Sequence, residues 1–253
     1  MFINLLLIVL ILLRLWIAVI LFVVGRQNKL TNLYWLGGSF LMFAVASAFV
    51  ASAGNPLGSL PFSLWVFAGF GILWLTATIQ FVSDTFYQRR RSAAPWIWGI
   101  MVVLSVGALY GVVVSPSPYQ QHPLVALVQV AACVIFGWQG WAGYQAWRGV
   151  AKEKTVEDWV KGRYQLVIWY SLCQFVASLS SAVRIVGAGG GTASRLGSAM
   201  ALVALLANIG MVVLAYLAWA APQGYYRWLN RNYKSAEVRE MSEEEVMQQM
   251  MGG

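Results

Sequence analysis

Acidic residues and histidine are scarce in this chain. Its 253 residues include nine acids and one histidine, against seventeen lysines and arginines, and the formal net charge is +8. A single histidine, His122, cannot supply paired axial ligands for haem or a histidine-rich metal centre. The apolar segments hold no pair of aspartates, and the chain has no phosphate-binding glycine loop. The sequence therefore predicts a protein that is not an enzyme and that holds no metal.

Lysine and cysteine exclude two further classes of protein. None of the five lysines lies in an apolar segment, so the last such segment lacks the lysine that a retinal Schiff base requires. The two cysteines, Cys133 and Cys173, both fall inside apolar segments, which indicates core residues rather than a disulfide framework. We expect no cofactor.

Long hydrophobic runs dominate what is present. Hydrophobic residues make up 60% of the chain and charged residues 10%. A membrane-spanning helix needs roughly 20 apolar residues, and seven segments meet this length: 3–24, 33–53, 62–86, 95–114, 124–147, 164–187 and 197–221. All seven prolines lie at segment ends or in connections, which favours unbroken helices. The sequence predicts an all-α integral membrane protein, with a seven-helix bundle in residues 1–223 and a cytoplasmic amphipathic tail in residues 224–253.

The first segment does not read as a signal peptide. No basic residue precedes it, it has no small-residue cleavage pattern, and Arg14 stands near its middle. We expect a retained helix.

Connections rich in lysine and arginine alternate along the chain with connections that have almost none. The connections 54–61, 115–123 and 188–196 hold one cation between them, Arg195, and no acid, whereas the others are basic. Because cytoplasmic loops keep an excess of basic residues, this predicts an outer N-terminus and a cytoplasmic C-terminus. The dispersed basic residues favour contact with anionic lipid head groups rather than nucleic acid. The expected location is the plasma membrane of a bacterium or archaeon.

Polar residues inside the predicted helices mark a candidate site. Counting about 1.5 Å of rise per residue puts Arg14 and Asn208 at nearly the same depth, close to the bilayer centre. Gln174 is also near mid-depth, and its spacing to Ser178 and Ser181 places all three on one helix face. These five residues are the predicted polar core or ligand-binding site.

Arg14 leaves several roles open. It could be held by neutral side chains and carbonyls as a structural clasp, or belong to a switchable hydrogen-bond network or pocket. It could also hold an anionic ligand or face a partner subunit. Because no acid lies at its depth, a proton relay is not expected.

Two outer arginines are candidates for anion or lipid binding. The polar stripe of the sixth segment continues to Arg184, and Arg195 precedes the seventh. No acid on that side can pair with them, so they predict contact with a lipid phosphate or an anionic ligand.

Asp84 is the only acid inside the predicted helices. Gln80 lies one turn before it on the same face. We expect Asp84 to pair with a cytoplasmic arginine, Arg163 or one of Arg89 to Arg91, either as a structural link or as a conformational latch.

The tail carries the pattern of a short helix. Ser242 and Glu245 form a capping box, and methionine-rich faces adapt to partners. Two interpretations stay open, a docking segment for a protein partner or a second copy of the chain, and a frayed terminus. The residues concerned are Val246, Met247, Met250 and Met251.

Three functional classes fit this pattern. The first, which we expect, is a non-enzymatic sensor or receptor-like protein that acts through a cytoplasmic or membrane partner. The second is an accessory transmembrane subunit of a larger membrane complex. The third is a small-solute transporter, and the lack of a proline or glycine pair that breaks corresponding helices in two halves speaks against it.

Overall fold

The structure is a computed structural model that describes residues 2–52, 61–87, 93–115, 122–152, 156–187, 195–221 and 223–230. Every element within these ranges is a helix. In chain order they are α1 (Phe2–Gln27), α2 (Thr31–Ser52), α3 (Pro61–Phe86), α4 (Ala94–Val114), the 3-10 helix η1 (Pro123–Ala126), α5 (Leu127–Val150), α6 (Asp158–Gly187), α7 (Arg195–Trp219) and α8 (Gln223–Leu229). The predicted all-α class is confirmed.

Six helices in the described ranges are long and apolar enough to cross a membrane. They are α1, α3, α4, α5 with η1, α6 and α7. The predicted segment 33–53 also forms a long helix, α2, which is 22 residues in length. It begins with Thr31 and Asn32 and is not among the six. The seventh span and the orientation of the bundle therefore stay predictions.

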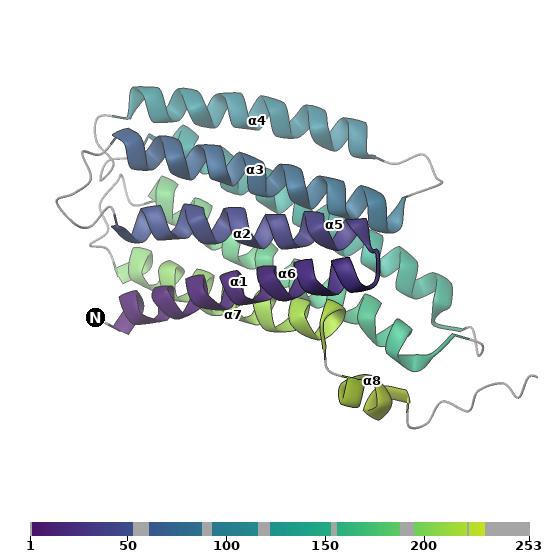
Figure 1. Cartoon of the computed structure of the whole chain (residues 1–253). Coiled ribbons are helices and arrows are strands. Elements are labelled where there is room, and N and C mark those ends of the chain that lie inside the picture. The colour runs from purple at the N-terminus through teal and green to yellow at the C-terminus, as the bar shows by residue number, and fades with distance from the viewer. Residues whose placement is uncertain are drawn as a thin grey trace, which may run out of the picture.

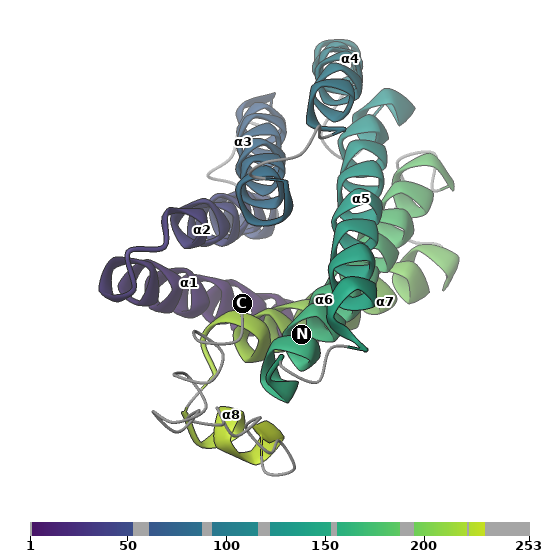
Figure 2. The same ribbon diagram turned by 90° about the vertical axis from the view of Figure 1, so that its right-hand side faces the viewer.

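The long helices lie side by side along a common direction (Figure 1). Viewed along the bundle, α1, α2 and α3 follow one another on one side, and α5, α6 and α7 form the other side (Figure 2). The first and last long helices, α1 and α7, are in contact, and α3 also packs on α5. α4 lies at the edge, against α3, α5 and η1.

Glycine allows α4 to approach η1 closely. A Cβ atom on Gly111 would lie 2.8 Å from Leu124 Cβ and 2.8 Å from the backbone nitrogen of Val125. Gly107, one turn earlier on the same face, would meet Leu127 Cδ1 at 2.6 Å. This spacing of two small residues is the common arrangement for packed membrane helices. At Gly111 the opposing atoms include backbone, so a larger residue would displace α4, whereas at Gly107 the opposing atom is the end of a leucine side chain that can move.

Most helix boundaries differ from those predicted by a few residues, and two of these differences lie at the connection between α5 and α6. α5 ends at Val150 rather than 147, and α6 begins at Asp158 rather than 164. Both extensions carry charged residues, so a prediction based on apolar runs misses them. The helix dipole stabilises an acid in the first turn of a helix, and Asp158 stands there in α6. As a result, α5 and α6 project beyond the other long helices at the end where α8 lies (Figure 1).

Large apolar side chains cover the outside of the bundle as well as its core. Trp96 on α4 is 80% exposed and Val103 is 70% exposed. Exposed apolar residues also line α1, α6 and α7. Apolar surface of this extent is suited to contact with lipid.

Candidate functional site

Arg14 is buried in the middle of the bundle. It lies halfway along α1, and its exposed fraction is 1%. Since α1 contacts both α2 and α7, the side chain reaches a junction of three helices. A charge in such a position requires polar partners.

Two neutral side chains from different helices accept hydrogen bonds from Arg14. Its Nη1 donates to Ser47 Oγ on α2 at 3.0 Å, and its Nη2 donates to Asn208 Oδ1 on α7. Asn208 thus lies at the depth of Arg14, as the count of rise along the predicted helices indicates. We call Arg14, Ser47 and Asn208 the arginine clasp.

Each acceptor is oriented by its own helix. The Ser47 hydroxyl donates to the carbonyl oxygen of Phe43 at 2.8 Å, and Asn208 Nδ2 donates to the carbonyl oxygen of Ala204 at 2.8 Å. One hydrogen of each side chain is thus directed to the backbone, and its oxygen atom accepts from the guanidinium. The arrangement suits a cation.

Aromatic rings continue from the clasp across the bundle. The guanidinium carbon of Arg14 lies 3.6 Å from the centroid of the Phe43 ring. Phe43 stacks on Trp74 of α3, with centroids 4.1 Å apart, and Trp74 packs on Phe136 of α5 at 5.6 Å. A cation over an aromatic face gains about 0.5–2 kcal/mol, more when water is excluded. Part of the charge of Arg14 is therefore balanced by a ring.

The clasp contains no counter-charge. Among the described residues Arg14 makes no ion pair, and its buried Nε has no hydrogen-bond partner. A buried charge without an opposite charge is costly, by several kcal/mol even after the protein relaxes. Neutral dipoles and one ring offset that cost here, and the buried Nε is left without an acceptor.

Gln174 and Ser178, the predicted neighbours on α6, are both buried but are not bonded to Arg14. Gln174 Nε2 lies 3.3 Å from Ser178 Oγ, and its Oε1 has no partner. The rest of the predicted stripe turns outward, since Ser181 is half-buried and Arg184 is exposed. Ten residues along a helix fall about 80° short of three full turns, so such a stripe winds around the axis. The expectation of one inward face for the whole stripe is wrong.

Asp84 does not pair with Arg163 in the described part of the chain. Its Oδ1 accepts a hydrogen bond from Gln80 Nε2 at 2.9 Å. Arg163 instead lies over two tryptophan rings, 4.3 Å from the centroid of Trp159 and 5.1 Å from that of Trp219. The other predicted partners, Arg89 to Arg91, lie outside the described residues.

The remaining predicted sites have little or no described geometry. Arg195 is the first residue of α7, and its side chain is outside the description. The tail positions also lie outside the described residues: Val246, Met247, Met250 and Met251. Their predicted roles stay predictions.

A second buried polar contact was not predicted. Gln139 on α5, which is 0% exposed, donates from Nε2 to the hydroxyl of Tyr170 on α6 at 2.8 Å. Ser47 of the clasp and Phe43, whose ring lies against Arg14, were also missed. Their four-residue spacing was a signal, because it places a hydroxyl and a ring on one face, but small residues on every side of α2 hide that face.

The described residues include no group of three or more histidine, cysteine, aspartate or glutamate side chains that could hold a metal ion. His122 has a local role, since its Nδ1 accepts from the backbone nitrogen of Leu124 at the start of η1, 3.3 Å away. Comparison with known proteins found no matching family model, no matching curated protein and no matching solved structure.

Proposed function

We propose that this chain is a non-enzymatic seven-helix membrane sensor whose switching element is the arginine clasp. One observation carries the proposal: a fully buried guanidinium joins α1, α2 and α7 through neutral acceptors only. Charged residues inside membrane bundles are commonly functional.

Neutral acceptors make the clasp reversible. A hydrogen bond to a charged group contributes about 1.5–3 kcal/mol net, whereas breaking a buried ion pair by removing one partner costs about 3–5 kcal/mol. When two states differ by a few kcal/mol, a ligand that binds one of them better shifts the equilibrium toward that state. An anionic or acceptor-bearing ligand that bound the buried Nε of Arg14 together with Nη2 would compete with Asn208.

In this proposal α2 is the seventh span, with the N-terminus outside and the C-terminus in the cytoplasm of a bacterial or archaeal cell. The basic loops then face an anionic leaflet. The chain passes its signal to a protein partner through the cytoplasmic end.

Distances between spin labels in lipid nanodiscs test the proposal. The labels replace Leu30, before α2, and Val213, on α7, which are 43% and 47% exposed. The background carries Cys133→Ala and Cys173→Ala, because both cysteines are free.

Four forms are compared, each with the same labels: the parent, two clasp variants and a control. We expect two distance populations in the parent, one clasped population in Asn208→Asp, which gives Arg14 a carboxylate, and enrichment of the other population in Arg14→Leu. Gly99→Ala on α4 is the matched control, because its added Cβ would meet open space. One identical population in all forms would contradict a switch and leave a static clasp.

A further inference from the structure

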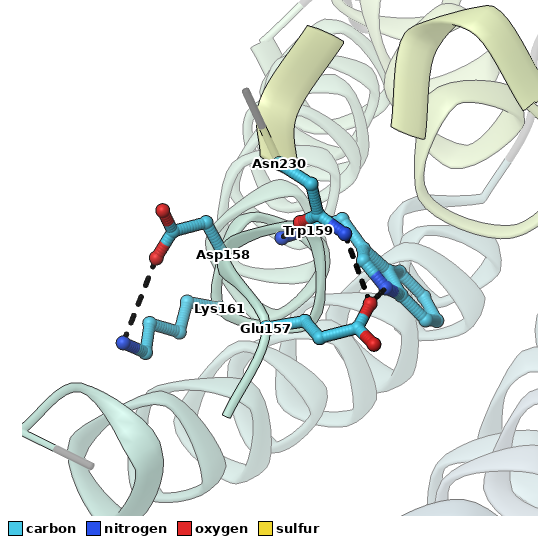
Figure 3. A network of polar contacts seen from close by, with 5 residues as sticks. All are labelled: Glu157, Asp158, Trp159, Lys161 and Asn230. Carbon is cyan, nitrogen blue, oxygen red and sulfur yellow. Dashed lines mark hydrogen bonds and ion pairs between the residues drawn. The ribbon is translucent and has the colours of Figure 1, made fainter. Parts of the chain in front are cut away.

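Asn230 ties the end of α8 to the start of α6. Its Oδ1 accepts a hydrogen bond from the backbone nitrogen of Trp159 at 3.0 Å, and its Nδ2 donates to Glu157 Oε2 at 2.9 Å (Figure 3). The indole nitrogen of Trp159 donates to the same carboxylate oxygen. Two of these three hydrogen bonds connect residues more than seventy positions apart.

These bonds satisfy groups that α6 cannot satisfy itself. The first backbone N–H groups of a helix have no partner within the helix, and a capping side chain just before the helix usually accepts from one of them. For Trp159 the acceptor is Asn230, which follows α8. The start of α6 is therefore capped by the distant segment that leads into the tail.

The neighbouring ion pair is separate from this contact. Lys161 Nζ lies 3.6 Å from Asp158 Oδ1, within the first turn of α6, on the far side of the helix from Asn230 (Figure 3). It provides a matched control, since it is a polar contact at the same helix end that does not involve α8.

The start of α6 also holds the end of α7. Arg163 lies over the ring of Trp219, the last residue of α7. Leu229 of α8 lies opposite Gly162, where an added Cβ would be 3.5 Å from Leu229 Cδ1. Residues 157–163 thus contact both sides of the connection between α7 and α8.

We infer that α8 is a releasable strap, held on α6 by Asn230 and freed when α7 moves. Asn208 and Trp219 lie on one continuous helix, eleven residues or about 16 Å apart. A displacement of α7 at the clasp therefore shifts Trp219 against Arg163, and α8 with it. This coupling rests on the proposed function, whereas the strap itself stands on the contacts of Asn230.

Hydrogen exchange of the full chain in nanodiscs tests the strap, with peptides from residues 156–163 and 223–230 as the readout. We expect Asn230→Ala to raise exchange in both peptides about tenfold, because the Trp159 N–H loses its acceptor. Lys161→Ala should leave the 223–230 peptide unchanged. If Asn230→Ala exchanges like the parent, or if both variants raise exchange in 223–230 equally, the strap is overturned.

The coupling is tested by the same readout in the clasp variants. Arg14→Leu should raise exchange of residues 223–230 at least threefold, and Asn208→Asp should lower it. If Arg14→Leu shifts the spin-label distances but leaves this exchange unchanged, the coupling is overturned and the sensor proposal stands. If the distances show one population while Asn230→Ala still raises exchange, the sensor proposal fails and the strap stands alone.

Discussion

Arg14 and Asn208 are hydrogen-bonded across the interface of α1 and α7, although 194 positions separate them in the chain. The bond joins the first and last long helices at the middle of the bundle. With Ser47 on α2 it connects three helices through one charged side chain. The helices that meet at this point cannot separate without exposing a charge to apolar surroundings.

Ser47→Ala should weaken the clasp without abolishing the fold. The variant removes one acceptor from the guanidinium, and we expect the free energy of unfolding to fall by about 1.5–3 kcal/mol. Unfolding titrations in mixed micelles would measure it. Ser198→Ala, at an exposed position on α7, is the control and should change nothing. Equal stability of the two variants would show that Ser47 does not hold Arg14.

Gly111→Ala should displace α4 from η1. The new Cβ would meet the backbone of Val125 at 2.8 Å, and backbone atoms cannot move aside as a flexible side chain can. We expect a loss of about 1–3 kcal/mol from overpacking, measured as a lower unfolding midpoint. Gly99→Ala on the same helix adds the same methyl group in open space and should be neutral. A neutral result for Gly111→Ala would contradict the close packing of α4.

Tyr170→Phe should leave the buried amide of Gln139 without its acceptor. Because Gln139 is fully buried, we expect a cost of about 1–3 kcal/mol in the free energy of unfolding. Tyr110→Phe, at a position 59% exposed on α4, is the matched control. The double variant Gln139→Leu with Tyr170→Phe should recover part of the loss, and a double variant less stable than either single one would argue against a direct contact.

The sequence is sufficient to place Arg14 and Asn208 at equal depth because rise along a helix can be counted, but not to pair them, since Gln174 is also near mid-depth and is not bonded to Arg14. Arg14 and Asn208 both lie in long uninterrupted segments, so equal depth follows from residue number alone. The sequence does not reveal Ser47 or Phe43, because packing decides how α2 is rotated about its axis and therefore which of its residues face Arg14. Along α2, small and apolar residues occur on every side and no single face is marked.

The contacts of Arg163 were not predictable for a different reason. Charge complementarity predicts that Arg163 pairs with Asp84. It does not tell whether Arg163 contacts that carboxylate or the two indole rings that the fold places beside it. The first turn of α6 is also capped by Asn230, which lies 71 positions after Trp159. A local pattern cannot contain that information.

A double-mutant cycle on Arg14 and Asn208 tests the clasp most directly, through the free energy of unfolding in mixed micelles. Asn208→Leu should cost about 1.5–3 kcal/mol, because the buried guanidinium of Arg14 loses a hydrogen-bond acceptor. Arg14→Leu should cost less, since Ser47 and Asn208 keep bonds to their own helices. The double variant should regain most of the loss of Asn208→Leu. Additive losses, or an Asn208→Leu variant as stable as the parent, would contradict the clasp.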